Sequence, residues 1–249
     1  MEMTLGEAFA RSARKFADKI ACMDDESSST YGQMNERVNR WVHAMKGLGW
    51  VKGKHVATLS NNCIPLMEIY LGNLKQGIVT VPLDSRGTIE DICFEMESTD
   101  CEALVIHSDF AGPAEELLHR IPRIKSVICM GGKVPGFAAD YEELLSKGSP
   151  EEPENHLVED DEAFLMFTGG TTGKSKGAIL THKSLLWNII SVTTENQSPT
   201  PEDKIYYPMQ MYHSAALSRF LAYMYAGGTF IVSKTFDPEV YLDMVEKER

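Results

Sequence analysis

A run of glycines, hydroxyl residues and lysines holds the side chains of this sequence that are best suited to chemistry. It follows the apolar stretch 163–167 and reads Thr168, Gly169, Gly170, Thr171, Thr172, Gly173, Lys174, Ser175, Lys176, Gly177. Glycines let backbone N–H groups turn toward an anion, hydroxyls add neutral donors and lysines add positive charge. Glycine–threonine loops also occur as plain turns, but a plain turn needs neither two lysines nor so many hydroxyls. The loop therefore predicts polyphosphate binding.

The loop of P-loop NTPases matches this segment only in part. Gly173-Lys174-Ser175 fits the end of G-x-x-x-x-G-K-[ST], but Thr168 stands where the first glycine is required. A P-loop opens directly into a helix, whereas the apolar run 176–180 is typical of a strand. Thr181 is then predicted to cap a later helix. A P-loop NTPase or kinase stays open as an alternative, and it predicts a helix from Ser175 with no strand at 177–180.

The loop and its flanks resemble the signature of the adenylate-forming superfamily, which includes acyl-CoA synthetases, aryl-CoA ligases and luciferases. That signature reads [YF]-T-S-G-T-T-G-x-P-K-G-V-x-x-[ST]-H, and residues 167–182 follow it nearly throughout. Gly169 stands in place of the usual serine and Ser175 in place of the usual proline. Residues 74–84 resemble a second motif of the family, L-K-A-G-A-x-x-V-P-[IL]-[DN]. In this order, the motifs extend the resemblance over essentially the whole chain.

The resemblance implies a ligase that joins a carboxylic acid to ATP, releases pyrophosphate and passes the acyl group to coenzyme A. Thr171, Thr172 and Lys176 would hold the β- and γ-phosphates, with Thr168 and Lys174 contributing from the flanks of the loop. Mg²⁺ is expected as a further cofactor. Its glutamate ligand in the family lies in a segment that these 249 residues lack, so no metal ligand is predicted among them.

A second candidate site is His213, a candidate catalytic residue. Met211-Tyr212-His213 resembles the family motif P-[LM]-[FY]-H, although Gln210 stands where proline is usual. The resemblance places His213 near the α-phosphate and the acid; the alternative is a histidine that only packs beneath a loop. The following segment is similar to fatty acyl-CoA synthetases, which implies an aliphatic acid. Several apolar residues are predicted either to line a tunnel for it or to belong to the core: Met209, Met211, Tyr212, Leu217 and Met224.

The elements that must position these residues alternate along the chain. Helices are predicted over 4–17, from Thr30 to 47 and over 65–74, and a polar turn over 24–29; strands are predicted at 20–23, 55–59, 77–83, 103–106 and 126–129. Such alternation predicts layered α/β/α sheets that are largely parallel. An acidic connector at 146–162 is expected to separate a first α/β subdomain, 1–145, from a phosphate-loop and acyl-pocket segment, 163–249.

Composition narrows the class of protein. The net charge is −12 and no basic stripe occurs outside the loop, which disfavours nucleic-acid binding. Five scattered cysteines without C-x-x-C spacing favour a reducing cytoplasm over a disulfide scaffold or a zinc site. The most apolar region, 215–232, contains Arg219 and Gly227-Gly228 and is predicted to be a core helix turning into a strand, so no transmembrane segment is expected.

Several motifs of the family do not occur in these 249 residues. The aromatic-Gly-x-Thr-Glu segment, the T-G-D aspartate and the catalytic lysine of the small C-terminal domain are missing, and Thr194-Glu195 lacks the residues that should precede it. The sequence is therefore expected to be the front part of an acyl-CoA synthetase, with absent or very weak activity alone. Apolar surface meant for the remaining segments would favour self-association. A non-catalytic nucleotide-binding or partner module, and an enzyme completed by a second chain, stay open.

Overall fold

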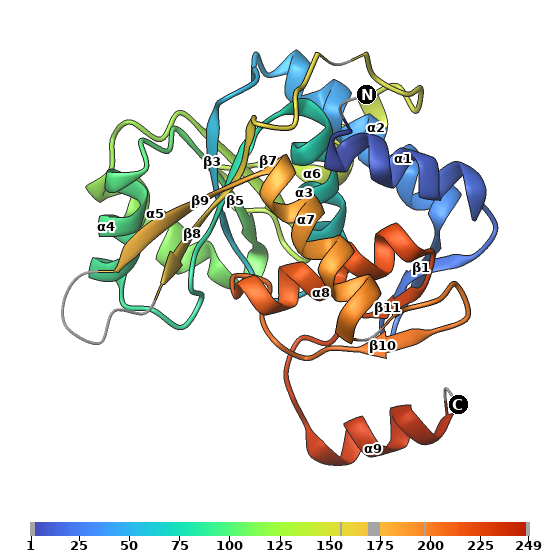
Figure 1. The fold of residues 1–249 in the computed structure, drawn as a ribbon. Helices are drawn as coiled ribbons and strands as arrows, with labels where there is room; N and C mark the ends of the chain where they lie inside the picture. Colours follow the sequence, from blue (N-terminus) through green and yellow to red (C-terminus); the bar gives the residue numbers. More distant parts are fainter. Residues whose placement is uncertain (1–2, 155, 169–174, 197, 248–249) are drawn as a thin grey trace.

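A computed structural model describes residues 3–154, 156–168, 175–196 and 198–247. Within these residues a large sheet runs in the order β7-β6-β5-β3-β4-β8-β9 and is parallel except for the β8–β9 hairpin. Its strands are β3 (His55–Leu59), β4 (Val79–Pro82), β5 (Ala103–His107), β6 (Ser126–Met130), β7 (Ala139–Asp140), β8 (Glu162–Thr168) and β9 (Lys176–Thr181). The layered, largely parallel α/β fold predicted from the sequence is confirmed (Figure 1).

A smaller sheet joins both ends of the chain. Its order is β10-β11-β1-β2, and its strands are β1 (Ile20–Met23), β2 (Ser28–Thr30), β10 (Lys204–Tyr206) and β11 (Thr229–Ile231). The predicted polar turn over 24–29 is wrong at its end, because Ser29 pairs with Cys22 in an antiparallel hairpin. Serine is a weak strand former on its own, so only this pairing makes the segment a strand.

Helices cover both faces of the large sheet. The helices of the described residues are α1 (Leu5–Lys15), α2 (Tyr31–Gly47), α3 (Ile64–Gln76), α4 (Ile89–Ser98), α5 (Ala111–Arg120), α6 (Tyr141–Lys147), α7 (His182–Ser191), α8 (Ser214–Ala226) and α9 (Pro238–Lys247), of which α9 lies away from the large sheet. One apolar cluster joins α4 and α5 to one face, and a larger one joins α1, α2, α3, α7 and α8 to the other. No helix in the described part of the chain is both long and apolar enough to cross a membrane.

Local sequence signals set most of the helix ends. Thr4, Thr30 and Thr181 each accept a hydrogen bond from a backbone N–H in the first turn of the helix that follows, and each forms a capping box. The caps predicted at Thr30 and Thr181 are confirmed. Gly77 ends α3 and Gly227 ends α8 in the left-handed region, with φ of 76° and 86°, where glycine avoids the steric cost of a Cβ.

The acidic connector is held to the helices by several contacts, among them hydrogen bonds from Asn39 and Arg40 of α2 to the carbonyls of Pro150 and Gly148. Buried Lys75 of α3 donates to the Glu152 carboxylate at 2.5 Å and to the side chains of Asn35 and Asn39. Most of the connector is exposed, as predicted. Strands from both sides of it enter each sheet, so the segments before and after it share one scaffold.

Candidate active site at the carboxyl edge of the large sheet

Three loops that follow parallel strands meet at one edge of the large sheet. Strands β3, β4 and β8 are neighbours and run parallel, so their carboxyl ends lie at the same edge, where α/β folds bind ligands. Asn62 follows β3, Asp84 and Arg86 follow β4, and the predicted phosphate loop follows β8. These loops therefore define the candidate site.

The β8–β9 hairpin carries the predicted phosphate loop. The candidate residues within the loop lie outside the described residues: Gly169, Gly170, Thr171, Thr172, Gly173 and Lys174. At its base Thr168 pairs with Lys176, and the Thr168 hydroxyl donates to the Lys176 carbonyl at 3.3 Å. Both residues are exposed. Strand β9 occupies 176–181, so the helix that the P-loop alternative requires from Ser175 is not formed.

Glu95 of α4 contacts the end of this loop. Its carboxylate Oε1 accepts a hydrogen bond from the Ser175 hydroxyl at 3.3 Å, and the side chain is buried. Burial raises the pKa of Glu95 to about 7; the Ser175 bond opposes the rise, and the negative charges of Asp84 and Asp91 add to it. A carboxyl group that titrates near neutrality thus lies beside the predicted phosphate site.

The second candidate residue lies at the start of α8. His213 is the N-cap residue of that helix, and its side chain is exposed rather than packed beneath the loop. Its ring lies against the ring of Tyr212, with 4.5 Å between centroids. The Tyr212 hydroxyl accepts a hydrogen bond from Arg86 Nε at 2.8 Å. Burial and the neighbouring Asp84 carboxylate raise the pKa of Tyr212, so the phenol stays neutral.

Asn62 fixes the segment that carries Tyr212 and His213. Its amide Nδ2 donates to the carbonyls of Met209 at 3.0 Å and Ser233 at 3.2 Å, and its Oδ1 accepts from the Met211 N–H at 3.0 Å. The side chain is 4% exposed. A single buried amide therefore joins the end of β3 to two later segments.

Two separate sets of contacts lie beside the two predicted sites. Tyr212 binds Arg86, which lies 3.9 Å from Asp84, and Ser175 binds Glu95. Sequence reasoning missed Asn62, Arg86 and Glu95 as site residues. For Asn62 a signal existed, because a polar residue soon after a buried strand is typical of such an edge. The sequence signal for Glu95 was weaker: it is an acidic residue between Ile92 and Met96 on the inner face of α4.

Most residues of the predicted tunnel belong to the core. Met211, Leu217 and Met224 are buried in the large apolar cluster, whereas Met209 is 41% exposed. A separate cavity of about 470 Å³ lies between α7 and α8, beside the N-terminal end of α8. Its lining mixes apolar and polar side chains: Leu180, Ser184, Leu185, Asn188, Val192, Ser214, Ala215, Ser218 and Arg219.

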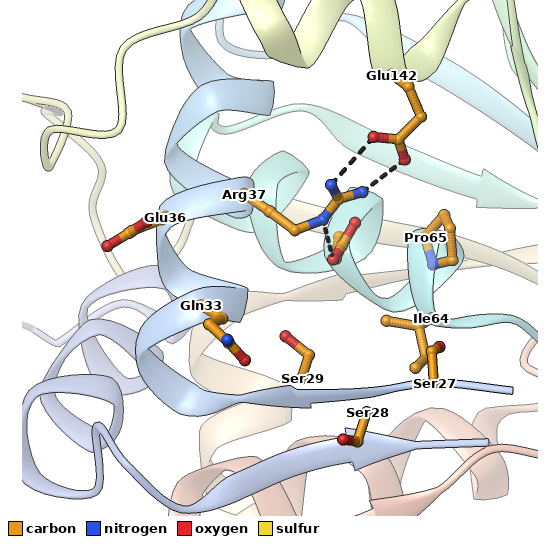
Figure 2. Close-up of a pocket in the computed structure, with 10 residues that line it drawn as sticks. Ser27, Ser28, Ser29, Gln33, Glu36, Arg37, Ile64, Pro65 and Glu142 are labelled. Carbon is orange, nitrogen blue, oxygen red and sulfur yellow. Dashed lines mark hydrogen bonds and ion pairs between the residues drawn. The ribbon is translucent and has the colours of Figure 1, made fainter.

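A second hollow, of about 510 Å³, lies between β2, α2, α3 and α6. Figure 2 shows Arg37 pointing at Glu142, to which it donates two hydrogen bonds at 2.6 and 3.0 Å, while Nε binds Glu68 at 2.6 Å. Glu36 adds a third carboxylate to the lining. Because the arginine is already paired and carboxylates outnumber it, this hollow does not suit a phosphate.

Known proteins that are similar in sequence to this chain include CoA ligases. A medium/long-chain-fatty-acid–CoA/3-oxocholest-4-en-26-oate–CoA ligase of Mycolicibacterium smegmatis is 28% identical over 244 residues, covering 89% of this chain and 44% of that protein. A feruloyl-CoA synthase of Amycolatopsis sp. is 29% identical over 247 residues, covering 98% and 47%. The chain thus spans about half the length of these curated relatives.

The fold is also similar to that of solved structures. The crystal structure of a long-chain-fatty-acid-CoA ligase (FadD1) from Archaeoglobus fulgidus superposes with a TM-score of 0.90 at 22% identity, covering 99% of this chain and 50% of that one. The family described as AMP-binding enzyme matches residues 9–249. That range contains both sheets and all the loops that meet at the candidate site, and the chain therefore belongs to the AMP-binding enzyme family.

Proposed function

We propose that this chain supplies the ATP-binding and acid-binding parts of an acyl-CoA ligase. In the reaction, a carboxylate attacks the α-phosphate of ATP, pyrophosphate leaves, and the acyl group then passes from acyl-AMP to the thiol of coenzyme A. The observation that carries the proposal is the meeting of loops at the carboxyl edge of neighbouring parallel strands: Arg86, which binds Tyr212, follows β4, and the β8–β9 hairpin follows β8. We infer from this arrangement that the predicted phosphate loop and His213 serve the same site.

The base of the β8–β9 hairpin fits the phosphates of ATP. Thr168 and Lys176 are exposed and paired with each other where the loop begins and ends, and hydroxyls and ammonium groups are suitable donors to phosphate oxygens. Lys176, with Thr171, Thr172 and Lys174 of the loop, would bind the β- and γ-phosphates. These contacts hold the leaving pyrophosphate in line and offset its charge. Mg²⁺ would accompany the ATP, and we place no Mg²⁺ ligand on the described residues.

His213 is proposed to act on the acid side of the reaction. Its exposed ring stands at the N-terminal end of α8, where the first N–H groups of a helix lack partners within the helix and carry partial positive charge. Such a position favours a carboxylate and the α-phosphate oxygens together. His213 would donate a hydrogen bond to these oxygens as charge moves between them.

A fatty acid is the proposed substrate, with its chain in the cavity between α7 and α8. Leu180, Leu185 and Val192 give that cavity an apolar part, and Ser214 and Ala215 bring it next to His213. Relatives of similar identity are named for fatty acids and for an aromatic acid. A panel of fatty and aromatic acids distinguishes the two classes. The melting temperature of the chain is measured with ATP and each acid, and the acids that bind raise it.

The cysteines bear on the cellular location of the protein. All five cysteines are free, and free thiols persist in a reducing environment. We therefore propose a cytoplasmic location.

Calorimetric titration with ATP tests the proposed function. We expect the chain to bind ATP, and Lys176→Ala to weaken binding at least about tenfold because a charge-assisted contact to phosphate is lost. Lys183→Ala is the matched control, since Lys183 is an exposed lysine paired with Glu159 at 2.8 Å. Absence of ATP binding would overturn the proposal.

Acid-dependent ATP–pyrophosphate exchange measures whether the chain forms acyl-AMP. We expect acid-dependent ATP–pyrophosphate exchange by the 249-residue chain alone to be absent or very weak, because the residues that the family uses for adenine, ribose and Mg²⁺ do not occur in it. Robust exchange would contradict the proposal that this chain cannot catalyse adenylation alone. ATP binding without exchange, even after the remainder of a ligase is supplied, would favour a non-catalytic nucleotide-binding module.

A further inference from the structure

Glu95 is a buried carboxyl group that the proposed chemistry does not use. It is 7% exposed on α4, and its helical neighbours Ile92 and Met96 belong to the apolar cluster that also contains Val81 of β4 and Leu165 of β8. The helix thus shares an apolar cluster with the strands that border the site. A group held in this way has a fixed position relative to the β8–β9 hairpin.

Ser175, the partner of Glu95, stands where the family signature has proline. Proline restricts φ to about −65°, whereas serine leaves the chain free at this point. The hydrogen bond from the Ser175 hydroxyl to Glu95 Oε1, at 3.3 Å, ties the segment to a packed helix instead. Lys176, the proposed phosphate ligand, is the next residue.

We propose that Glu95 is a positioning residue for the phosphate loop: through Ser175 it fixes the end of the loop and the backbone of Lys176, and so replaces the restriction that proline gives in the signature. This inference rests on the proposed ATP-binding function. It assigns a task to a residue of α4 that neither the sequence motif nor the proposed chemistry contains.

The negative charges around Glu95 make ATP binding depend on pH. Asp84, from the connection between β4 and α4, and Asp91, one turn earlier on α4, are the charged groups that raise its pKa, after burial. Phosphates of ATP would add further negative charge nearby and favour the protonated carboxyl group. ATP binding near pH 7 to 8 is therefore expected to take up a proton, and affinity to fall as the pH rises above 7.

Variants at both ends of the contact test the inference. We expect Glu95→Ala and Ser175→Ala each to weaken ATP binding by about five- to tenfold, and the double variant to lose no more than either single one, because they break the same contact. Ser175→Pro should restore near wild-type affinity to Glu95→Ala. Glu95→Gln keeps an acceptor for Ser175 and should remove the proton uptake, measured by titration in buffers of different ionisation enthalpy. Glu97→Gln, an exposed carboxylate two residues further on, is the control and should change nothing.

Amide hydrogen exchange in the ATP-free chain provides a second, independent measurement. Exchange at Ser175 and Lys176 should accelerate in Glu95→Ala and in Ser175→Ala. If the wild type binds ATP and both variants bind it equally well, the positioning role is overturned while the proposed function stands. If the wild type binds no ATP, the proposed function fails. If hydrogen exchange at Ser175 and Lys176 is also unchanged in the variants, Glu95 does not hold this segment and the positioning role fails as well. Ser175→Ala keeps the test decisive if Glu95→Ala does not fold.

Discussion

At the scale of single residues, His182 shows how a motif position can serve the fold. It follows Thr181 in the family signature, and the structure buries it completely at the start of α7. Its Nδ1 accepts a hydrogen bond from the Leu5 N–H at 3.1 Å, so the ring is neutral and joins α7 to α1. Burial lowers the pKa of His182 to about 4, although the charge of Asp161 opposes this.

This burial predicts a loss of stability in mild acid. The pKa of His182 is about 4 in the folded chain and near its ordinary 6.5 when unfolded, so between these values the unfolded chain binds more protons. Its contribution to stability is complete above pH 6.5 and falls by about 3 kcal/mol as the pH drops to 4. Chemical unfolding from pH 7.5 to 4.5 measures this. His182→Gln should be less stable at pH 7 and less pH-dependent, and exposed His119→Gln should match the wild type; an unchanged slope in His182→Gln would contradict the assignment.

At the scale of elements, one asparagine holds the segment that leads into α8. The segment before α8 has little regular structure apart from β10, and its position over the sheet depends on the three hydrogen bonds to Asn62. The presentation of Tyr212 and His213 therefore depends on the end of β3, about 150 residues earlier in the chain.

Removing this asparagine should damage the fold and the site together. Asn62→Ala leaves the buried Met211 N–H without its acceptor and two carbonyls without their donor, at a cost of about 2–4 kcal/mol in unfolding free energy. Asn62→Asp keeps the acceptor for Met211 and should lose less. Denaturant unfolding, together with hydrogen exchange at Met211, measures both effects. Equal stability of Asn62→Ala and the wild type would show that this segment is positioned by other contacts.

At the scale of the whole molecule, apolar side chains lie exposed on α7 and α9. Trp187 and Ile190, one turn apart on α7, are 65% and 37% exposed. Helix α9, drawn in red in Figure 1, contacts β10 through the rings of Tyr241 and Tyr206 and exposes Val240, Leu242 and Val245. Clustered apolar surface of this kind favours association.

Self-association of the chain therefore remains our prediction. Trp187→Lys should shift the population toward monomer and raise the dissociation constant by about tenfold or more, because burying an exposed tryptophan is among the largest single contributions to association. Light scattering after size-exclusion chromatography measures the population over a range of concentrations. Val51→Lys, which removes an exposed valine from the turn before β3, is the control. A chain that is monomeric at every concentration would contradict the prediction.

The sequence by itself determined many of the helices and strands, and it predicts the chemistry of the loop. Capping threonines, helix-ending glycines and apolar periodicity are local signals, and they located α1, α2, α7 and most strands. The run from Thr168 to Lys176 predicts phosphate binding because glycines, hydroxyls and lysines occur together in it. Strand β2 was among the elements that local signals did not predict, since its pairing with β1 makes it a strand.

Only the tertiary structure decided which distant residues meet at the site. Asn62, Arg86 and Glu95 come from three loops or helices of the first hundred residues, and each contacts a segment beyond residue 170. No local pattern encodes such contacts, because they depend on the order of the strands in the sheet and on which loops share its carboxyl edge. The raised pKa of Glu95 has the same origin: a solvated glutamate becomes a neutral-pH acid only when packing removes it from water beside other carboxylates.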